Sequence, residues 1–237
     1  MGRVSPTSHA HIFDGYSLVA RSLIIAGIAF LAYAQTASPQ EGKSSTAPAS
    51  IDSTELADFD ENPSAVRSLL ERCLALTKQN LGYQYGSSDP KEGVMDCSGT
   101  VYFVLQAAGI TDVPRTASEQ YVWTRKAGTF VPVISRKLDS FEVDALRPGD
   151  LLFWTGTYST DRDPPVTHSM VYLGRRQDNG KRIMFGASDG RSYEGRKIWG
   201  VSVFDFTIAQ SVQKVFPGDT SKPGSLFIGY AHIPRLE

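Results

Sequence analysis

The chain has few of the side chains that bind metals. It contains two cysteines and four histidines in 237 residues. Beyond residue 34 these are Cys73, Cys97, His168 and His232, which lie far apart, whereas zinc ligands usually come in pairs a few residues apart. We therefore predict no metal site and no other cofactor.

An excess of basic charge is also missing. The 24 Lys and Arg residues balance 25 Asp and Glu residues, for a net charge of -1, and the basic residues are scattered along the chain. A protein that binds nucleic acid usually carries a basic stripe or patch. The composition, 41% hydrophobic and 21% charged, is typical of one soluble domain with a sizeable core and no nucleic-acid partner.

There is no hydrophobic run of the ~20 residues that a membrane-spanning helix needs. A shorter run, "SLIIAGIAFLAYA", follows Arg21 and ends in Ala32-Tyr33-Ala34. This layout predicts a secretory signal peptide over residues 1–34 and export to the periplasm, the cell wall or the extracellular space, without stable membrane association after cleavage. An uncleaved N-terminal anchor is the alternative. No cysteine follows the run, so a lipid anchor is not indicated.

Residues 35–54 lack aromatic side chains and are rich in Ser, Thr, Ala and Pro. Such a composition buries too little apolar surface to order itself, so we predict a disordered linker. The ordered domain is expected to span residues 55–237. We find no internal repeat within it.

The patterning of this domain predicts an α+β fold. Apolar residues recur at helical spacing after Ser64 as far as Gly82, a second helix is expected from Cys97 to about Ala108, and a third follows Pro114. After residue 138, short β-rich runs alternate with turn-forming stretches. N-terminal helices packed on a C-terminal antiparallel sheet are therefore expected.

Cys97 stands at the predicted start of the second helix, directly after Asp96. A thiol in the first turn of a helix faces unpaired N–H groups, which favour the nucleophilic thiolate. Asp96 fits the N-cap of this helix. Gly99 costs helix stability unless another backbone must approach closely there. A disulfide between Cys73 and Cys97 is the structural alternative, although Cys73 is expected on the apolar face of the first helix.

A thiol nucleophile also needs a general base and acid, and histidine is the usual one. His9 and His11 fall within the predicted signal segment. His168 opens the run "HSMVYLG" at a predicted strand end, where a side chain can reach a cleft. His232 lies inside the last predicted strand, where a packed or surface role is expected. His168 is therefore the candidate.

The segments "YQYG", "DCSG", "GI", "PRTASEQY", "LRPGDLLFW" and "HSMVYLG" follow one another between residues 81 and 174. In this order they resemble the NlpC/P60 family of cell-wall endopeptidases, papain-like cysteine peptidases that cut peptidoglycan stem peptides. The resemblance implies Cys97 as nucleophile and His168 as base and acid. It also implies that Tyr83 lines the site and helps to hold the oxyanion. Asp96 and Ser98 are expected to support the geometry of the nucleophile and to belong, with Tyr83, to the substrate-binding residues. The expected bond joins the side-chain carboxyl of D-glutamate to a diamino acid.

The chain departs from the family pattern at Gly186. The family usually has a third polar residue there, which fixes the ring of the catalytic histidine. Ser188 faces the same side of the predicted strand and is our candidate for this third catalytic residue. A backbone carbonyl, a water molecule or a bare Cys–His pair remain open.

Two other functions compete with the peptidase. "GASDG" at residues 186–190 matches the nucleophile elbow of serine hydrolases, with Ser188 as nucleophile. That elbow requires a following helix, which "RSYEGRKIWG" does not favour. A domain without its third residue could instead bind wall peptides without cutting them, although such a module needs neither Cys97 nor His168.

Overall fold

The computed structural model describes residues 47–208, 224–233 and 236, so the predicted signal peptide and most of the predicted linker lie outside the described residues. The α-helices are α1 Ser64–Thr77, α2 Cys97–Ala107, α3 Ala117–Lys126 and α4 Phe141–Asp144, and short 3₁₀ turns occupy Ser53–Glu55, Phe59–Glu61 and Pro90–Glu92. Among the described residues, no helix has the length and apolar character needed to cross a bilayer.

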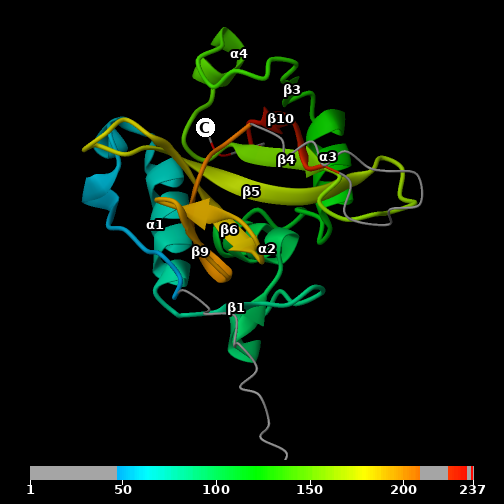
Figure 1. Cartoon of the computed structure of the whole chain (residues 1–237), viewed down its shortest axis with the longest axis horizontal. Helices are drawn as coiled ribbons and strands as arrows, with labels where there is room; N and C mark the ends of the chain where they lie inside the picture. Colours follow the sequence, from blue (N-terminus) through cyan, green and yellow to red (C-terminus); the bar gives the residue numbers. More distant parts are fainter. Residues whose placement is uncertain (1–46, 209–223, 234–235, 237) are drawn as a thin grey trace, which may run out of the picture. The chain divides into compact units, whose positions relative to one another are not determined.

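A six-stranded sheet forms the centre of the domain (Figure 1). Its strand order is β3-β10-β4-β5-β6-β9, and every neighbouring pair is antiparallel. These strands are β3 Phe130–Pro132, β10 Leu226–Ala231, β4 Leu151–Thr155, β5 Val166–Arg175, β6 Arg182–Ser188 and β9 Gly200–Asp205. Two small ribbons accompany them, β1 Gly82–Tyr83 with β2 Val94–Met95 and β7 Ser192–Tyr193 with β8 Arg196–Lys197.

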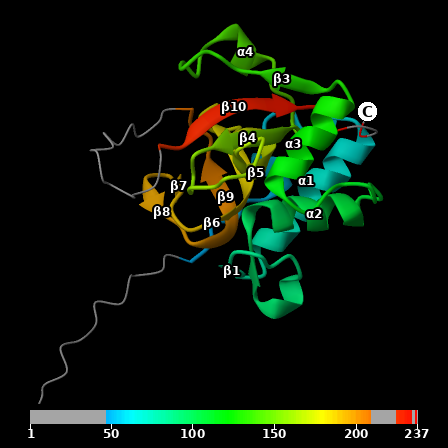
Figure 2. The same cartoon turned by 90° about the vertical axis from the view of Figure 1, so that its right-hand side faces the viewer.

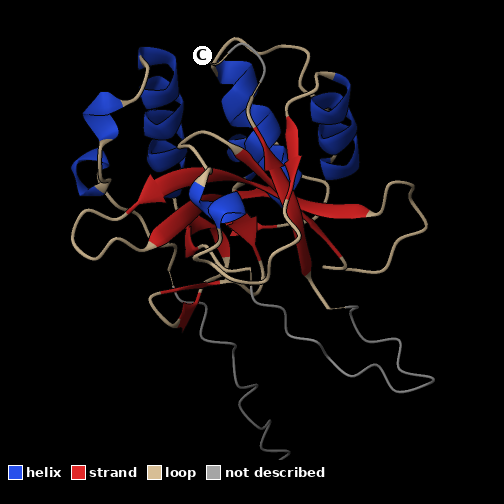
Figure 3. Cartoon of the chain, turned by 90° about the horizontal axis from the view of Figure 1, so that it is seen from above, coloured by secondary structure: helices blue, strands red, loops and turns tan. Residues whose placement is uncertain are grey.

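Helices α1, α2 and α3 cover one face of this sheet (Figures 2 and 3). Helix α2 packs against β5 and β6, α3 against β5, and α1 against β6 and β9. Trp154, Tyr172, Phe206 and Phe227 form a separate aromatic cluster, with ring centroids 5.1–6.5 Å apart. The predicted α+β architecture, with helices before strands in the chain and packed on an antiparallel sheet, is confirmed.

The helix boundaries differ slightly from those predicted. Helix α1 ends at Thr77, before the expected stop at Gly82, and Asn80 adopts a left-handed conformation with φ 54°. Pro63, rather than Ser64, occupies the N-cap of α1. Helix α2 begins at Cys97, as predicted, and is followed by Gly109 in a left-handed conformation that most side chains disfavour.

The residues just before position 55 belong to the folded domain. Ala49 is buried, its N–H donates to Ser202 Oγ at 2.8 Å, and its carbonyl accepts from Val203 N at 3.0 Å. Ile51 is buried as well. This corrects the predicted start of the domain, because two apolar side chains and backbone pairing to β9 hold a segment whose composition alone indicates disorder.

Candidate active site

The start of helix α2 is built around Asp96, which caps it as predicted. The Asp96 carboxylate accepts the N–H of Gly99 at 2.6 Å and that of Gly86 at 2.7 Å. At Gly99, a Cβ would lie 2.3 Å from the carbonyl oxygen of Ser87, which confirms the expected close approach of another backbone. The loop after β1 is thereby held against the first turn of α2, and this fixes the position of Cys97.

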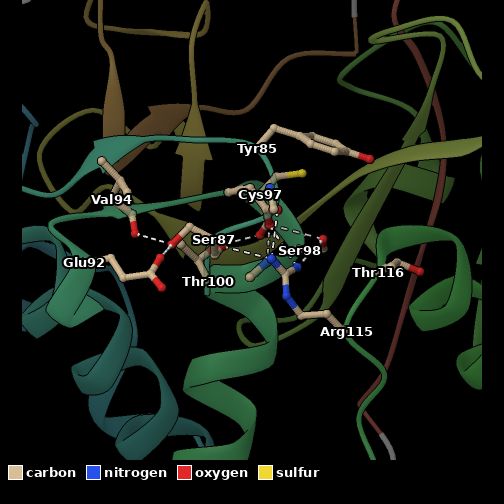
Figure 4. Close-up of polar contacts among 12 residues, drawn as sticks. Tyr85, Ser87, Glu92, Val94, Cys97, Ser98, Thr100, Arg115 and Thr116 are labelled. Atoms are coloured by element: carbon tan, nitrogen blue, oxygen red, sulfur yellow. Dashed lines mark hydrogen bonds and ion pairs between the residues drawn. The ribbon is translucent and has the colours of Figure 1, made fainter. Parts of the chain in front are cut away.

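Arg115 binds the other side of the same carboxylate. Its guanidinium donates to Asp96 Oδ2 at 2.9 Å, to the carbonyl of Ser87 at 2.9 Å and to Ser98 Oγ at 3.1 Å. The Asp96 side chain is only 6% exposed, so this is a largely buried ion pair. Figure 4 shows Arg115 reaching between Ser87 and Ser98, while the sulfur of Cys97 points away from the cluster.

The thiol of Cys97 lies against the backbone of β5 on both sides of His168. Its Sγ is 4.0 Å from the carbonyl oxygen of Thr167. Burial, and then the negative charge of Asp96, raise the pKa of Cys97 to about 11, although the backbone N–H groups of Ser169 and Ser98 act in the opposite direction. The expected lowering of this pKa is therefore wrong, because the loss of hydration outweighs the backbone N–H groups around the thiol.

His168 lies near the start of β5, opposite Trp154 of β4. Its ring packs edge-on against the Trp154 ring, with centroids 5.6 Å apart. The side chain of the next residue, Ser169, points to α3 and donates to Gln120 at 2.6 Å, so His168 faces the other way. Among the described residues, no hydrogen bond joins the imidazole to the Cys97 thiol.

Arg191 makes the polar contact to His168. Its Nε–H donates to Nε2 of the imidazole at 3.2 Å, and its guanidinium stacks 4.1 Å from the centroid of Trp154. Burial, followed by the positive charge of Arg191, lowers the pKa of His168 well below its usual range. The imidazole is therefore neutral near neutral pH.

Ser188, predicted to orient His168, is engaged elsewhere. Its Oγ accepts the N–H groups of Gly190 and Arg191, both at 3.3 Å, and closes the turn that carries Arg191. A Cβ at Gly186 would lie 2.9 Å from the Met170 side chain, so Met170 fills the place of the expected polar residue. The contact to the imidazole thus comes from Arg191, which is a correction to the prediction based on strand periodicity.

A cleft of about 950 Å³ opens over His168. Tyr83, Trp154, Thr167 and Arg191 line it together with His168. Burial, and next the proximity of Cys97, raise the pKa of the Tyr83 phenol, which is consistent with a place beside the thiol. Asp96 and Ser98, expected on the substrate side, are buried in the Arg115 cluster and are not among the residues that line this cleft.

The remaining candidates lie apart from this cleft or outside the described residues. Cys73 and Cys97 are both free, so the disulfide alternative is excluded. His232 pairs with Asp150 at 2.7 Å, in line with the packed role expected for it, while His9 and His11 fall outside the described residues. In the described part of the chain, no cluster of His, Cys, Asp and Glu could hold a metal ion.

The serine-hydrolase alternative fails on local structure. Ser188 is the last residue of β6, and it is followed by a turn and the strand β7 Ser192–Tyr193. A nucleophile elbow places its serine between a strand and a helix, which would supply the backbone donors. The segment "GASDG" is therefore a turn.

Two arginines at the site were not predicted. Arg115 belongs to the segment "PRTASEQY", but nothing in its spacing from Asp96 signals a buried ion pair. Arg191 follows a Gly in a turn-rich stretch where a solvated side chain is the ordinary expectation. The contact between Arg191 and His168 depends on how the turn after β6 folds back over the sheet, which residue patterns do not reveal.

Known proteins resemble this chain over the same region. The model of the NlpC/P60 family matches residues 80–199. A γ-DL-glutamyl hydrolase of Bacillus subtilis is 37% identical over 109 residues, which are 45% of this chain and 22% of that protein.

Two solved structures also match. An NLP/P60-family lipoprotein-like protein of Staphylococcus aureus has a TM-score of 0.43 at 22% identity, over 79% of this chain and 44% of that one. An NlpC/P60 endopeptidase of Photobacterium damselae has a TM-score of 0.42 at 16% identity, over 66% and 37%. The chain thus spans less than half the length of each of these relatives. With half of its residues matched by the family model, around the thiol and histidine described above, the chain belongs to the NlpC/P60 family.

Proposed function

We propose that this protein is an exported cysteine peptidase that hydrolyses the γ-D-glutamyl amide to a diamino acid in peptidoglycan stem peptides. The observation that carries the proposal is the buried thiol of Cys97 at the start of α2, packed against the β5 backbone beside His168, which lines the cleft. Family membership and the similarity to a γ-DL-glutamyl hydrolase support this substrate class. The signal peptide proposed for residues 1–34 agrees with a substrate outside the cytoplasm.

In the proposed reaction, Cys97 Sγ attacks the amide carbonyl and gives up its proton to His168. His168 then protonates the leaving amine, so the C–N bond breaks and a thioester to Cys97 remains. Water, deprotonated by His168, hydrolyses the thioester and regenerates the thiol. Tyr83 is proposed to donate a hydrogen bond to the oxygen that becomes negative, because a neutral phenol in this environment retains its proton.

The polar residues around the start of α2 are proposed to position the nucleophile and not to contact the substrate. Asp96, held by Arg115, caps α2 and sets the direction of the thiol, and Ser98 Oγ donates to Asp96 at 3.3 Å. The roles proposed for Asp96 and Ser98 are therefore to position Cys97. Ser188 holds the turn that carries Arg191.

Digestion of a defined disaccharide-tetrapeptide by the purified chain tests the proposed function. Mass spectrometry should find two products, one ending in D-glutamate with a new carboxyl group and one beginning with the free amine of the diamino acid. Products cut at another amide would contradict the proposed bond. Tight binding of the peptide without any products would favour the alternative of a non-catalytic wall-binding module.

A further inference from the structure

The cleft over His168 does not reach the proposed nucleophile. Cys97 is only 6% exposed, and it is not among the residues that line the cleft. Burial raises the pKa of Tyr158 to about 12, and the proximity of Tyr85 and of Cys97 adds to this effect, so the Tyr158 phenol lies near the thiol. A peptide that enters the cleft therefore meets His168 but not the sulfur of Cys97.

Tyr158 belongs to the connection between β4 and β5, residues 156–165, which we call the latch loop. The loop is anchored near both of its ends. At the first end, the N–H and the hydroxyl of Thr157 donate to Thr167 Oγ1 at 3.0 and 2.8 Å. At the other end, the carbonyl of Pro164 accepts from Ser118 Oγ of α3 at 2.8 Å. Most of the stretch between these anchors lines the cleft.

Arg162 ties this stretch of the latch loop to the segment after β1. Its Nη2 donates to the hydroxyl of Tyr85 at 3.0 Å, and its Nη1 donates to the hydroxyl of Tyr158 at 3.3 Å. The two phenol rings also meet edge to face, with centroids 5.8 Å apart. In the view of Figure 4, the Tyr85 ring projects in the same direction as the sulfur of Cys97. The three side chains thus join two separate parts of the chain close to the thiol.

The contacts that hold the latch loop are largely open to water. Tyr85 is 60% exposed, and Arg162 is exposed as well. Polar contacts at such positions add little to stability, because water replaces them when they break. A loop held by contacts of this kind can open locally while the rest of the domain stays folded.

We propose that the latch loop covers Cys97, that the contacts of Arg162 with Tyr85 and Tyr158 keep it closed, and that it must open before a substrate reaches the thiol. The inference rests on the proposed function in taking Cys97 as the reactive thiol. The rate of any reaction at Cys97 is then proportional to the fraction of molecules with an open latch loop. Opening also hydrates the thiol, which removes the main obstacle to its deprotonation.

Alkylation of Cys97 by iodoacetamide tests the inference without turnover. The parent protein carries Cys73→Ala, so that Cys97 is its only cysteine, and intact-mass spectrometry follows the reaction. Arg162→Met and Tyr85→Phe each remove the hydrogen bond across the cleft, and each should accelerate alkylation about threefold to tenfold, the range for one hydrogen bond. Loss of the Arg162 charge by itself would disfavour the thiolate and slow the reaction, so acceleration reports opening.

A double variant and a matched control complete the experiment. Arg162→Met with Tyr85→Phe should be alkylated about as fast as Arg162→Met alone, because both changes remove the same hydrogen bond. Arg125→Met is the control, since its guanidinium donates to the hydroxyl of Tyr121 at 2.9 Å and neither residue lines the cleft. Its alkylation rate should equal that of the parent. Urea unfolding gives the stability of each variant.

Unchanged alkylation in Arg162→Met and Tyr85→Phe would overturn the inference, and so would an equal acceleration in Arg125→Met. An acceleration matched by an equivalent fall in the free energy of unfolding would also overturn it, because Cys97 would then react through global unfolding. Failure of the proposed function appears separately, as variants that are alkylated faster in a chain that leaves the γ-glutamyl amide intact.

Discussion

Replacement of Cys97 by alanine should lower the rate of γ-glutamyl amide cleavage by about 10⁴-fold or more, because the neighbouring hydroxyl of Ser98 is directed to Asp96 and cannot take over the attack. The rate is measured as kcat/KM on a defined muropeptide by liquid chromatography. The folded structure should be retained, since the smaller side chain still fits the first turn, and Asp96 continues to accept the N–H of Gly99.

Cys73→Ala is the matched control, because it removes the second free cysteine from the same chain. Cys73 is fully buried in α1, and burial raises the pKa of its thiol, so it behaves as a small apolar side chain. Its replacement should cost about 1 kcal/mol of stability and leave kcat/KM within a factor of two or so. Comparable activity losses in the two variants, or a fully active Cys97→Ala, would contradict the assignment of Cys97.

Replacement of Arg115 by methionine should lower the free energy of unfolding by about 3 kcal/mol. The change leaves the carboxylate of Asp96 buried without its cation, and breaking a buried pair on one side costs about 3–5 kcal/mol. The lower end of that range applies, because the Arg115 side chain is 28% exposed. Urea unfolding followed by circular dichroism measures the difference.

Arg175→Met provides the comparison for an exposed ion pair. Arg175 lies 3.3 Å from Asp144, with both side chains about half exposed, so its loss should cost at most about 1 kcal/mol. If Arg115→Met is no more destabilising than Arg175→Met, the Asp96–Arg115 pair does not hold the start of α2. A double replacement, Arg115→Met with Asp96→Asn, should recover part of the loss because it removes the buried charge.

Local patterns determined the fold class and the position of the thiol. The start of α2 was predictable because an acidic N-cap, a small side chain and a glycine are requirements of local geometry, and each is met by contacts to Asp96 and Ser87. The sheet was predictable from short β-rich runs separated by turn-forming stretches. The burial of Ala49 was not predictable, since its backbone pairs with Ser202 and Val203 of β9, which lie far along the chain.

The electrostatics of the site were less predictable. Helix geometry alone indicates a lowered pKa for Cys97, whereas the degree of burial, which only the tertiary structure defines, has the larger and opposite effect. Gly186 indicated that the polar side chain expected beside His168 is missing. Strand alternation then predicted Ser188 as the residue that contacts the imidazole, whereas the contact comes from Arg191. A long side chain that folds back from a turn can contact residues that no periodic pattern connects to it.

In the proposed reaction the substrate becomes covalently attached to Cys97. Rapid acid quenching of the chain mixed with a defined muropeptide, followed by intact-mass and peptide mass spectrometry, measures this directly. We expect a protein adduct with the mass of the D-glutamyl half of the substrate, located on the peptide that contains Cys97. Product formation with no adduct at any quench time, or an adduct on Ser188, would contradict it.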